Sequence, residues 1–343
     1  MLKQMEQKSI INIRPLGFPW ETLDPFIFCV HHRDEYPKGN KVMGPDASLA
    51  GRNIGQDFTV KDGWRMYHGS KIPGFPYHPH RGFETVTVVK EGLIDHFDSL
   101  GATRRFGKGD VQWMTAGKGV LHAEMFPLVN RDKENPMELF QIWLNLPRMN
   151  KFVEPHYKML WEDMIPVLHE NDSNGKTTEV NVISGSLHNA KAPEPTPDSW
   201  AANAEHDVMI LTIKLEAGAV WTLSKASVDA GRMLYFYRGG NLKIEDEIIP
   251  SYHSVQVKAD HKITLEAGDQ DCFLLVLQGK PLQEPVVQYG PFVMNSEAEI
   301  KEAFQEYQKT QFGGWPWPEN EPVHSRDKGR FAIYADGKVE VKS

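Results

Sequence analysis

Two short pairs of side chains are the residues of this sequence best suited to chemistry. His78 and His80 lie two residues apart, and His122 and Glu124 repeat that spacing. Alternate residues of a β-strand point to the same face, so each pair can direct both side chains at one point. Three neutral imidazole nitrogens and one carboxylate oxygen make a suitable ligand set for a divalent metal ion. The sequence therefore predicts one metal site formed by these four residues.

A single histidine pair of this kind is more often an ordinary surface or core feature than a metal site. Here two pairs occur, and both lie in glycine-rich sequence with the alternating pattern of strands. Their agreement favours the metal. The roles of two neighbours stay open. Glu84 is a further ligand, a hydrogen-bond partner of a ligating histidine or an outward-pointing residue, and we favour the second. His96 fits a structural role better.

Composition restricts the class of protein. The chain has 343 residues, of which 40% are hydrophobic and 24% charged, as in globular proteins of one large or two medium domains. Its formal net charge of -8 argues against direct binding of nucleic acid. No apolar signal segment begins the chain, and no stretch is long enough to span a membrane. Two distant cysteines, Cys29 and Cys272, predict no disulfide framework and a cytoplasmic location.

The pattern of apolar residues predicts a chain built mainly from β-strands. In the first half, residues 83–89 and 93–97 are expected to form a hairpin, and 111–114 and 138–146 are further strands. Residues 33–70 are polar and aperiodic, so they are expected to be either a functional loop or a disordered segment. Strand patterns return in the second half, at residues 180–183, 208–213, 233–237 and 272–277.

The two halves share an outline that indicates an internal duplication. Residues 87–94 and 235–242 each read as an apolar strand, a glycine turn and a second strand. The second half has no histidine pair at the matching place, and His206, His253 and His261 are scattered without ligand spacing. We therefore expect a metal site in the first copy alone.

One helix is indicated near the end of the chain. Ser296 and Glu299 have the spacing of a capping box, and a single apolar face follows them. This face is expected to pack on the second barrel or the domain junction, and the glycines at 313–314 end the helix. Residues 330–334 and 338–341 are predicted to form a terminal hairpin.

Three longer motifs carry a resemblance to a known family. The sequences HPHRGFETV at 78–86, QWMTAGKGVLHAEM at 112–125 and EPVVQYGPFVMN at 284–295 resemble those of the pirin family, which are bicupins of the cupin superfamily. The resemblance implies an all-β fold class with two cupin-type β-barrel (jelly-roll) domains and a C-terminal helix. We expect a metal-binding cupin domain at 1–147, a cupin domain without metal at 148–312 and a C-terminal extension at 313–343.

The resemblance also implies a function. It suggests iron held by His78, His80, His122 and Glu124, and an oxidoreductase similar to quercetin 2,3-dioxygenase (a quercetinase) that acts on a flavonol. The alternative is an iron-binding regulatory or interaction protein without turnover, as eukaryotic pirins act as transcriptional cofactors. Fe(II) suits the ligands, although Mn, Co, Ni or Cu would also fit. The expected partner is a small aromatic substrate, without direct nucleic acid or membrane, while protein partners stay open.

Within this interpretation Glu124 has a second, catalytic role. A carboxylate on the metal can also take the proton of an enol hydroxyl. No cofactor-binding residues are predicted besides the metal ligands. The long loop at 33–70 departs from the family pattern and is expected to cover or reshape the mouth of the site. Six residues are candidate pocket walls, with core as the better interpretation for most: Phe83, Trp113, Met114, Phe126, Phe140 and Trp143.

Overall fold

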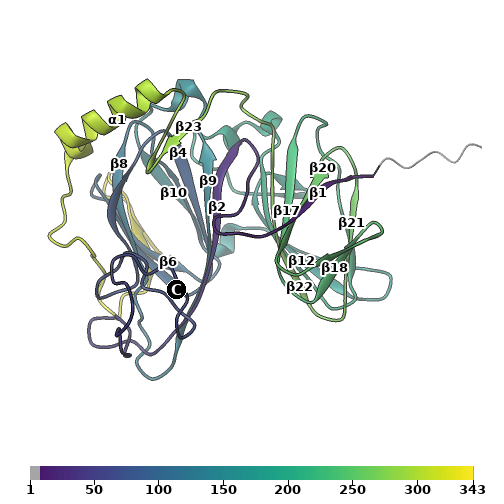
Figure 1. Cartoon of the computed structure of the whole chain (residues 1–343), viewed down its shortest axis with the longest axis horizontal. Coiled ribbons are helices and arrows are strands. Elements are labelled where there is room, and N and C mark those ends of the chain that lie inside the picture. Colours follow the sequence, from purple (N-terminus) through teal and green to yellow (C-terminus); the bar gives the residue numbers. More distant parts are fainter. Residues whose placement is uncertain (1–7, 343) are drawn as a thin grey trace, which may run out of the picture. The chain divides into compact units, whose positions relative to one another are not determined.

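The computed structural model describes residues 8–342 (Figure 1). These residues divide into two compact units. One unit, called the first barrel here, comprises residues 30–162 and 284–342, and the other, the second barrel, comprises residues 8–29 and 163–283. The limits of the units therefore differ from the expected boundaries at 147 and 312, because the last segment of the chain belongs to the first barrel.

The first barrel contains a five-stranded and a six-stranded sheet. The five-stranded sheet, in the order β10-β7-β4-β9-β2, consists of β2 (Phe26–Tyr36), β4 (Phe83–Glu91), β7 (Val111–Thr115), β9 (Asn135–Asn145) and β10 (His156–Leu160). The six-stranded sheet, in the order β26-β25-β6-β5-β8-β3, consists of β3 (Gly74–His80), β5 (Leu93–Asp98), β6 (Thr103–Gly107), β8 (Val120–Met125), β25 (Arg330–Ile333) and β26 (Val339–Lys342).

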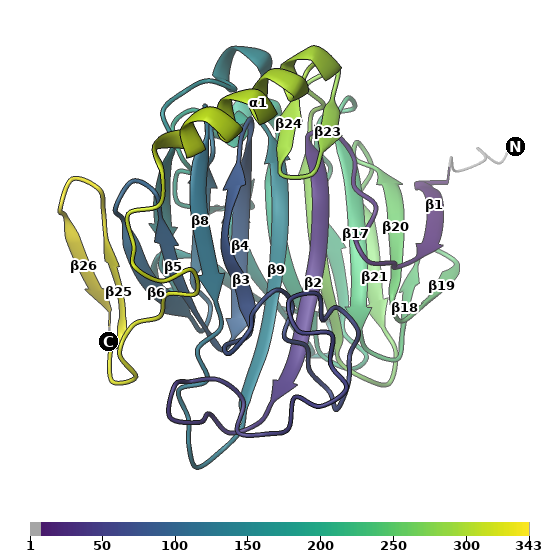
Figure 2. The same ribbon diagram turned by 60° about the vertical axis from the view of Figure 1, so that its left-hand side comes forward.

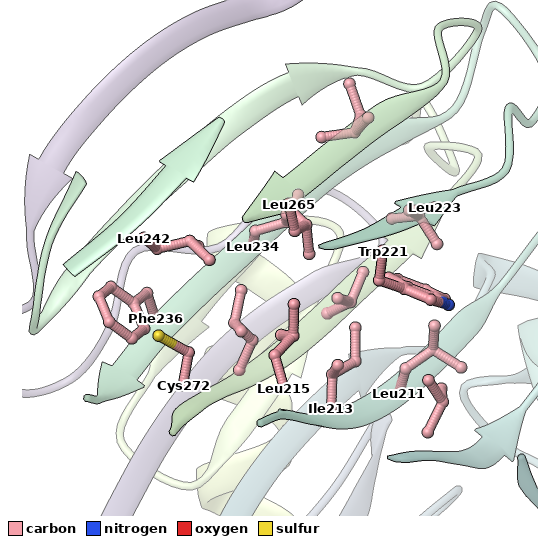
Figure 3. Close-up of a cluster of buried hydrophobic side chains, with 14 of the residues drawn as sticks. Leu211, Ile213, Leu215, Trp221, Leu223, Leu234, Phe236, Leu242, Leu265 and Cys272 are labelled. Carbon is pink, nitrogen blue, oxygen red and sulfur yellow. The ribbon is translucent and has the colours of Figure 1, made fainter. Parts of the chain in front are cut away.

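The second barrel contains a seven-stranded and a four-stranded sheet. The larger, in the order β1-β20-β17-β22-β15-β12-β11, consists of β1 (Ile10–Pro15), β11 (Val167–Asn171), β12 (Thr177–Ser184), β15 (Met209–Leu215), β17 (Gly231–Arg238), β20 (His253–Lys258) and β22 (Cys272–Gly279). The smaller, in the order β16-β21-β18-β19, consists of β16 (Val220–Leu223), β18 (Asn241–Ile244), β19 (Glu247–Pro250) and β21 (Ile263–Ala267). The interior of the second barrel is a cluster of apolar side chains from both sheets (Figure 3).

Short elements complete the chain. Two further hairpins are formed by β13 (Ser186–Leu187) with β14 (Ala190–Lys191) and by β23 (Val287–Tyr289) with β24 (Phe292–Met294). Single 3₁₀ turns lie at η1 (Arg148–Asn150), η2 (Glu162–Met164), η3 (Trp200–Ala202), η4 (Ala204–His206) and η5 (Gln311–Gly313). No helix within residues 8–342 combines the length and apolar character needed to cross a membrane.

The strand predictions are confirmed, but one pairing was wrong. Residues 83–89 and 93–97 do form β4 and β5, yet β4 pairs with β7 and β9 whereas β5 pairs with β6 and β8. Between them Gly92 adopts φ +86°, a left-handed conformation that favours glycine. The chain therefore passes from one sheet to the other at this turn instead of folding back as a hairpin.

The predicted helix is α1 (Glu297–Thr310), and it begins as expected. Ser296 is the N-cap, and its hydroxyl accepts a hydrogen bond from the backbone N–H of Glu299. The helix ends one turn before the glycines, at Thr310, followed by Gln311 in a left-handed conformation. The expected packing partner was wrong, because the apolar face of α1 packs on Phe292 and Met294 of β24, within the first barrel.

The residues after α1 form a strap along the first barrel (Figure 2). The backbone N–H of Tyr77 donates to Asn320 O at 3.1 Å, and Trp317 Nε1 donates to Asp98 O at 2.8 Å. The predicted terminal hairpin is confirmed as β25 and β26, and β25 pairs antiparallel with β6. The C-terminal extension is thus an integral part of the six-stranded sheet.

Candidate metal centre

The pairing of β3 with β8 brings the two predicted pairs together. In this antiparallel ladder His78 lies directly opposite His122, and a bulge before His78 sets Phe75 opposite Glu124. Residues opposite one another in a ladder share a face of the sheet. The alternation within each strand then places His80 on the same face as His78. Strand parity and strand pairing together gather the three imidazoles.

The three histidine rings meet through their Nε2 atoms. His78 Nε2 lies 3.1 Å from His80 Nε2 and 2.9 Å from His122 Nε2. His80 and His122 are buried, and His78 is partly buried. All three potential ligand atoms lie within 4.8 Å of one another. The structure thus confirms that these three predicted residues converge.

The other ring nitrogens show where the protons are. His78 Nδ1 lies 2.9 Å from Pro76 O, and His80 Nδ1 lies 3.3 Å from Pro291 O. A backbone carbonyl only accepts, so each Nδ1 carries the proton and donates it. Each Nε2 is then a bare lone pair. Two lone pairs facing one another at 3.1 Å form no hydrogen bond and repel.

A cation between the rings accounts for this arrangement. Histidine nitrogens bind divalent metals at about 2.0–2.1 Å, so two ligands at a right angle are about 3.0 Å apart and two at the tetrahedral angle about 3.4 Å. The observed separations of 2.9 and 3.1 Å correspond to right angles. His78 and His80, and likewise His78 and His122, are therefore spaced like neighbouring ligands of a six-coordinate ion.

Glu124 approaches the histidines from β8 and spans the barrel interior. Its carboxylate oxygen lies within 4.8 Å of ligand atoms of both His96 and His122, and these three form a second group of potential ligands. Thr87 Oγ1 donates to Glu124 Oε1 at 3.3 Å, and Gln141 Nε2 donates to Oε2 at 2.9 Å. The carboxylate is therefore oriented by β4 and β9 of the opposite sheet.

Burial sets the protonation of these groups. It lowers the pKa of His78 to about 4 and lowers the pKa of His80 and His122 well below the usual range, so all three rings are neutral at pH 7. Burial also raises the pKa of Glu124 to about 7, against the hydrogen bond from Thr87 and the charge of Arg104. Neutral imidazoles are the form that binds a metal, and a bound cation favours the ionised carboxylate.

Comparison with known proteins identifies the family. The pirin family model matches residues 40–144, and the model of the pirin C-terminal cupin domain matches residues 210–313. Human pirin is 34% identical over 254 residues, which are 72% of this chain and 80% of the relative. The chain belongs to the pirin family. The predicted family and its all-β fold of two cupin domains are therefore confirmed.

Two further relatives of this pirin-family chain bear on its chemistry. A Pseudomonas aeruginosa protein named "putative quercetin 2,3-dioxygenase" is 37% identical over 240 residues, covering 70% of this chain and 79% of the relative. The crystal structure of quercetin 2,3-dioxygenase from Acinetobacter baumannii is 25% identical, with a TM-score of 0.69 over 89% of this chain and 98% of that one. This likeness extends through both cupin domains.

The long loop of this pirin-family chain supplies part of the site's surroundings. Residues 37–73 bring the rings of Phe58 and His68 against Phe75, at centroid distances of 6.4 and 5.7 Å, and Phe75 lies 6.4 Å from the ring of His78. His68 Nδ1 donates to Gly55 O at 2.7 Å, which leaves Nε2 as an acceptor. The loop thus places an aromatic wall and one hydrogen-bond acceptor beside the histidines.

A buried network holds this loop to β2. Arg65 forms a two-pronged ion pair with Asp34 at 2.9 and 3.0 Å, and Tyr67 Oη donates to Asp34 Oδ2 at 2.6 Å. The C-terminal strap adds a second anchor, because Glu321 accepts hydrogen bonds from the backbone N–H groups of Ser70 and Lys71. The loop is therefore a fixed wall with defined partners.

The other candidate walls separate into two sets. Phe83 and Trp143 stand edge-on to His80, at 5.0 and 5.3 Å. Phe126 packs against Phe75 at 6.1 Å and so lies behind the aromatic wall. The remaining three, Trp113, Met114 and Phe140, are buried core residues, as the sequence favoured.

Two neighbours of the proposed ligands were left open by the sequence. The carboxylate of Glu84 accepts a hydrogen bond from Thr115 Oγ1 at 2.7 Å, and neither group of potential ligands includes it. His96, interpreted as structural, lies opposite Glu124 in the ladder and places Nε2 2.8 Å from His122 Nδ1. The proximity of His96 to His122 follows from the pairing of β5 with β8, a strand order that the sequence alone does not give.

Proposed function

We propose that this chain is a metal-dependent dioxygenase of the quercetin 2,3-dioxygenase type that acts on a flavonol such as quercetin. The observation that carries the proposal is the meeting of three Nε2 lone pairs inside a barrel whose relatives bear that activity in their names. Fe(II) is the metal we propose. The substrate is a small aromatic molecule, and the protein works in the cytoplasm.

His78, His80, His122 and Glu124 are the residues that would hold the metal. The three imidazoles and the Glu124 carboxylate would supply four ligands to a six-coordinate ion, which would leave two positions for a substrate oxygen and dioxygen. A divalent iron held there would supply Lewis acidity toward the substrate oxygen and redox chemistry with dioxygen. The aromatic wall of Phe58 and Phe75 offers ring faces for a flat substrate.

Glu124 has the second role of a proton acceptor. The flavonol binds through an enol hydroxyl, whose proton must leave as the oxygen becomes anionic. The Glu124 carboxylate lies within 4.8 Å of a ring nitrogen of His122 and is held by Thr87 and Gln141. It receives this proton, and the burial that isolates it from water keeps the proton in the site.

Oxygen uptake with iron-loaded protein tests the function. The full chain is loaded with Fe(II) without oxygen, and quercetin and air are then added. We expect oxygen consumption together with loss of the flavonol absorbance. Stoichiometric iron with no uptake across a panel of flavonols would overturn the proposal and favour an iron-binding regulatory protein.

Glu124→Gln tests the proton acceptor. Removal of a general base costs roughly 10²–10⁴-fold in rate, so we expect turnover to fall by at least 100-fold while much of the metal is retained. Glu84→Gln is the matched control, since it changes another buried carboxylate of the same barrel that bonds to Thr115. Unchanged turnover in Glu124→Gln would sink this role.

A further inference from the structure

Arg104 is a buried cation placed behind the proposed metal ligands. It lies on β6, its side chain is completely buried, and its guanidinium stacks 3.4 Å above the ring of Tyr157. Nη2 lies 3.0 Å from His96 Nε2, and Nη1 lies 3.2 Å from Asp98 Oδ2. Nε donates to Gln112 Oε1. The side chain is thus held on every edge, and one of its contacts is His96.

This contact decides which nitrogen of His96 carries the proton. A guanidinium has donors and no acceptor. His96 Nε2 must therefore be the acceptor, and its proton resides on Nδ1. The reverse assignment would direct two N–H groups at one another across 3.0 Å. Among the described residues, the buried His96 Nδ1 has no hydrogen-bond partner. The ring therefore leaves its own N–H unpaired and keeps Nε2 as an acceptor.

The assignment passes on to His122. His122 Nδ1 lies 2.8 Å from the same His96 Nε2, which can only accept, so His122 donates from Nδ1. The lone pair of His122 is then on Nε2, the atom that meets His78 Nε2 at 2.9 Å. Two of the three histidines obtain this tautomer from backbone carbonyls, whereas His122 obtains it from a second histidine governed by Arg104.

We propose that Arg104 and His96 form a positioning relay that fixes His122 as an Nε2 ligand and raises the reduction potential of the bound metal. The inference rests on the metal site of the proposed function. A carboxylate behind a ligating histidine would increase the electron density on its ring. Here the acceptor is the neutral ring of His96, which already accepts a hydrogen bond from Arg104. It therefore polarises the N–H of His122 less than a carboxylate would and adds less electron density to that ring. The positive charge of Arg104 also favours the reduced metal.

The electrostatics of the site agree with this relay. Burial lowers the pKa of both His96 and His122 well below the usual range, and the charge of Arg104 lowers them further. The same charge lowers the pKa of Glu124, against the effect of burial. Arg104 is therefore felt at two of the four proposed ligands, and Asp98 balances its charge in part.

Two substitutions of His96 test the positioning role. His96→Gln offers a carbonyl oxygen to His122 Nδ1, and His96→Leu offers nothing. Loss of such a partner typically costs 10–100-fold in metal affinity. We expect that loss in His96→Leu and recovery of most of it in His96→Gln, measured by Fe(II) competition with a chromophoric chelator. Equal affinities in the two variants would overturn the positioning role.

Arg104→Gln, combined with Asp98→Asn so that no buried charge is left unpaired, tests the potential. At a fixed solution potential we expect the ratio of Fe(II) to Fe(III) in the protein to fall by about tenfold, a shift of about 59 mV for one electron. The control is Arg330→Gln combined with Asp110→Asn, which removes another ion pair of the same barrel and likewise leaves the net charge unchanged. A double variant with the potential of the wild type would overturn the tuning role.

These readouts separate the inference from the proposed function. Metal affinity and reduction potential can be measured without a flavonol. If the protein binds iron without turnover, the proposed function is contradicted, and the variants of His96 and Arg104 still test the relay. A wild-type chain that binds no divalent metal would overturn both. If Arg104→Gln with Asp98→Asn does not fold, the pair of His96 variants still decides the positioning role, and Arg104→Lys, which keeps the charge, should keep the potential.

Discussion

The interiors of the two barrels differ in kind. In the described part of the second barrel one charged side chain, Arg232, is buried, and the interior is a continuous cluster of leucine, isoleucine, valine and aromatic residues (Figure 3). The first barrel is also built from two large sheets, but it buries many histidines, carboxylates and cations. Among them are His80, His96, His122, Asp34, Glu84, Asp95, Asp98, Asp110, Glu124, Arg104, Arg105 and Lys151.

The difference shows how one fold serves two purposes. Burying a charged or polar group costs free energy unless it is paired, whereas burying apolar surface contributes about 25 cal/mol per Å². The described interior of the second barrel gains its stability mainly from buried apolar surface. The first barrel gives up part of that stability to hold groups that can bind a cation, and ion pairs such as Arg105 with Asp95 compensate for some of the cost.

The largest expected effect is loss of metal from the first barrel alone. His80→Ala removes one of the three converging imidazoles, and we expect elemental analysis of the purified protein to fall from about one iron per chain to a small fraction. His253→Ala in the second barrel is the control and should leave the metal content unchanged. Equal metal in His80→Ala and the wild type would contradict the site.

The next effect is a large loss of stability from the second barrel. Leu265 is fully buried in the apolar cluster, so Leu265→Ala leaves a cavity and should cost about 2–5 kcal/mol. Hydrogen exchange of the strands of that barrel measures the loss. The first barrel should keep its iron, and a parallel loss of iron would show that the two barrels are not independent in function.

A smaller effect concerns the acid stability of the first barrel. Burial lowers the pKa of His324, which stacks on Phe97, to about 3. The unfolded chain takes up this proton near pH 6.5 while the folded chain does not, so stability is lost as the pH falls from about 6.5 to about 3.

The variant His324→Phe keeps the stacking and removes that proton. Its free energy of unfolding should depend less on pH between about 4 and 6, by at most about 1.4 kcal/mol per pH unit for one proton. Hydrogen exchange of the β25 peptides at several pH values measures the slope. Identical slopes for variant and wild type would show that His324 is protonated in the folded protein.

The smallest expected effect concerns substrate discrimination. His68→Phe keeps the ring contacts with Phe58 and Phe75 but removes the acceptor at Nε2. A single hydrogen bond contributes about 1 kcal/mol, so we expect binding of quercetin to weaken about fivefold, while a flavonol without hydroxyls on its outer ring binds as before. Titration of iron-loaded protein without oxygen gives both constants. The same change for both ligands would exclude this contact.

The arrangement of the proposed metal ligands within each strand could be predicted from the sequence because it is local. Parity within β3 and β8 is enough to place His78 beside His80 and His122 beside Glu124, and the motifs are long. The relay could not be predicted, because it depends on β5 lying between β6 and β8, an order that no local pattern reveals. The stretch Thr103–Gly107 also reads as polar, although every residue of β6 is buried.

The long loop shows the same limit. Its length and lack of periodicity are visible in the sequence, and the prediction of a functional segment is consistent with its contacts at Phe75. The placement of His68 depends on Asp34, Arg65 and Glu321, which are distant in the chain and pair only in the folded protein. Similarly, the partner of α1 follows from the return of the chain to the first barrel.

That return has a consequence for synthesis on the ribosome. Strand β25 pairs with β6, yet more than 220 residues separate the two, and residues 163–283 of the second barrel are translated between them. Residues 163–283 of the second barrel can fold while the chain is still growing, whereas the six-stranded sheet of the first barrel waits for β25 and β26. The sheet that carries the proposed metal ligands is therefore complete only after residues 330–342 have been synthesised.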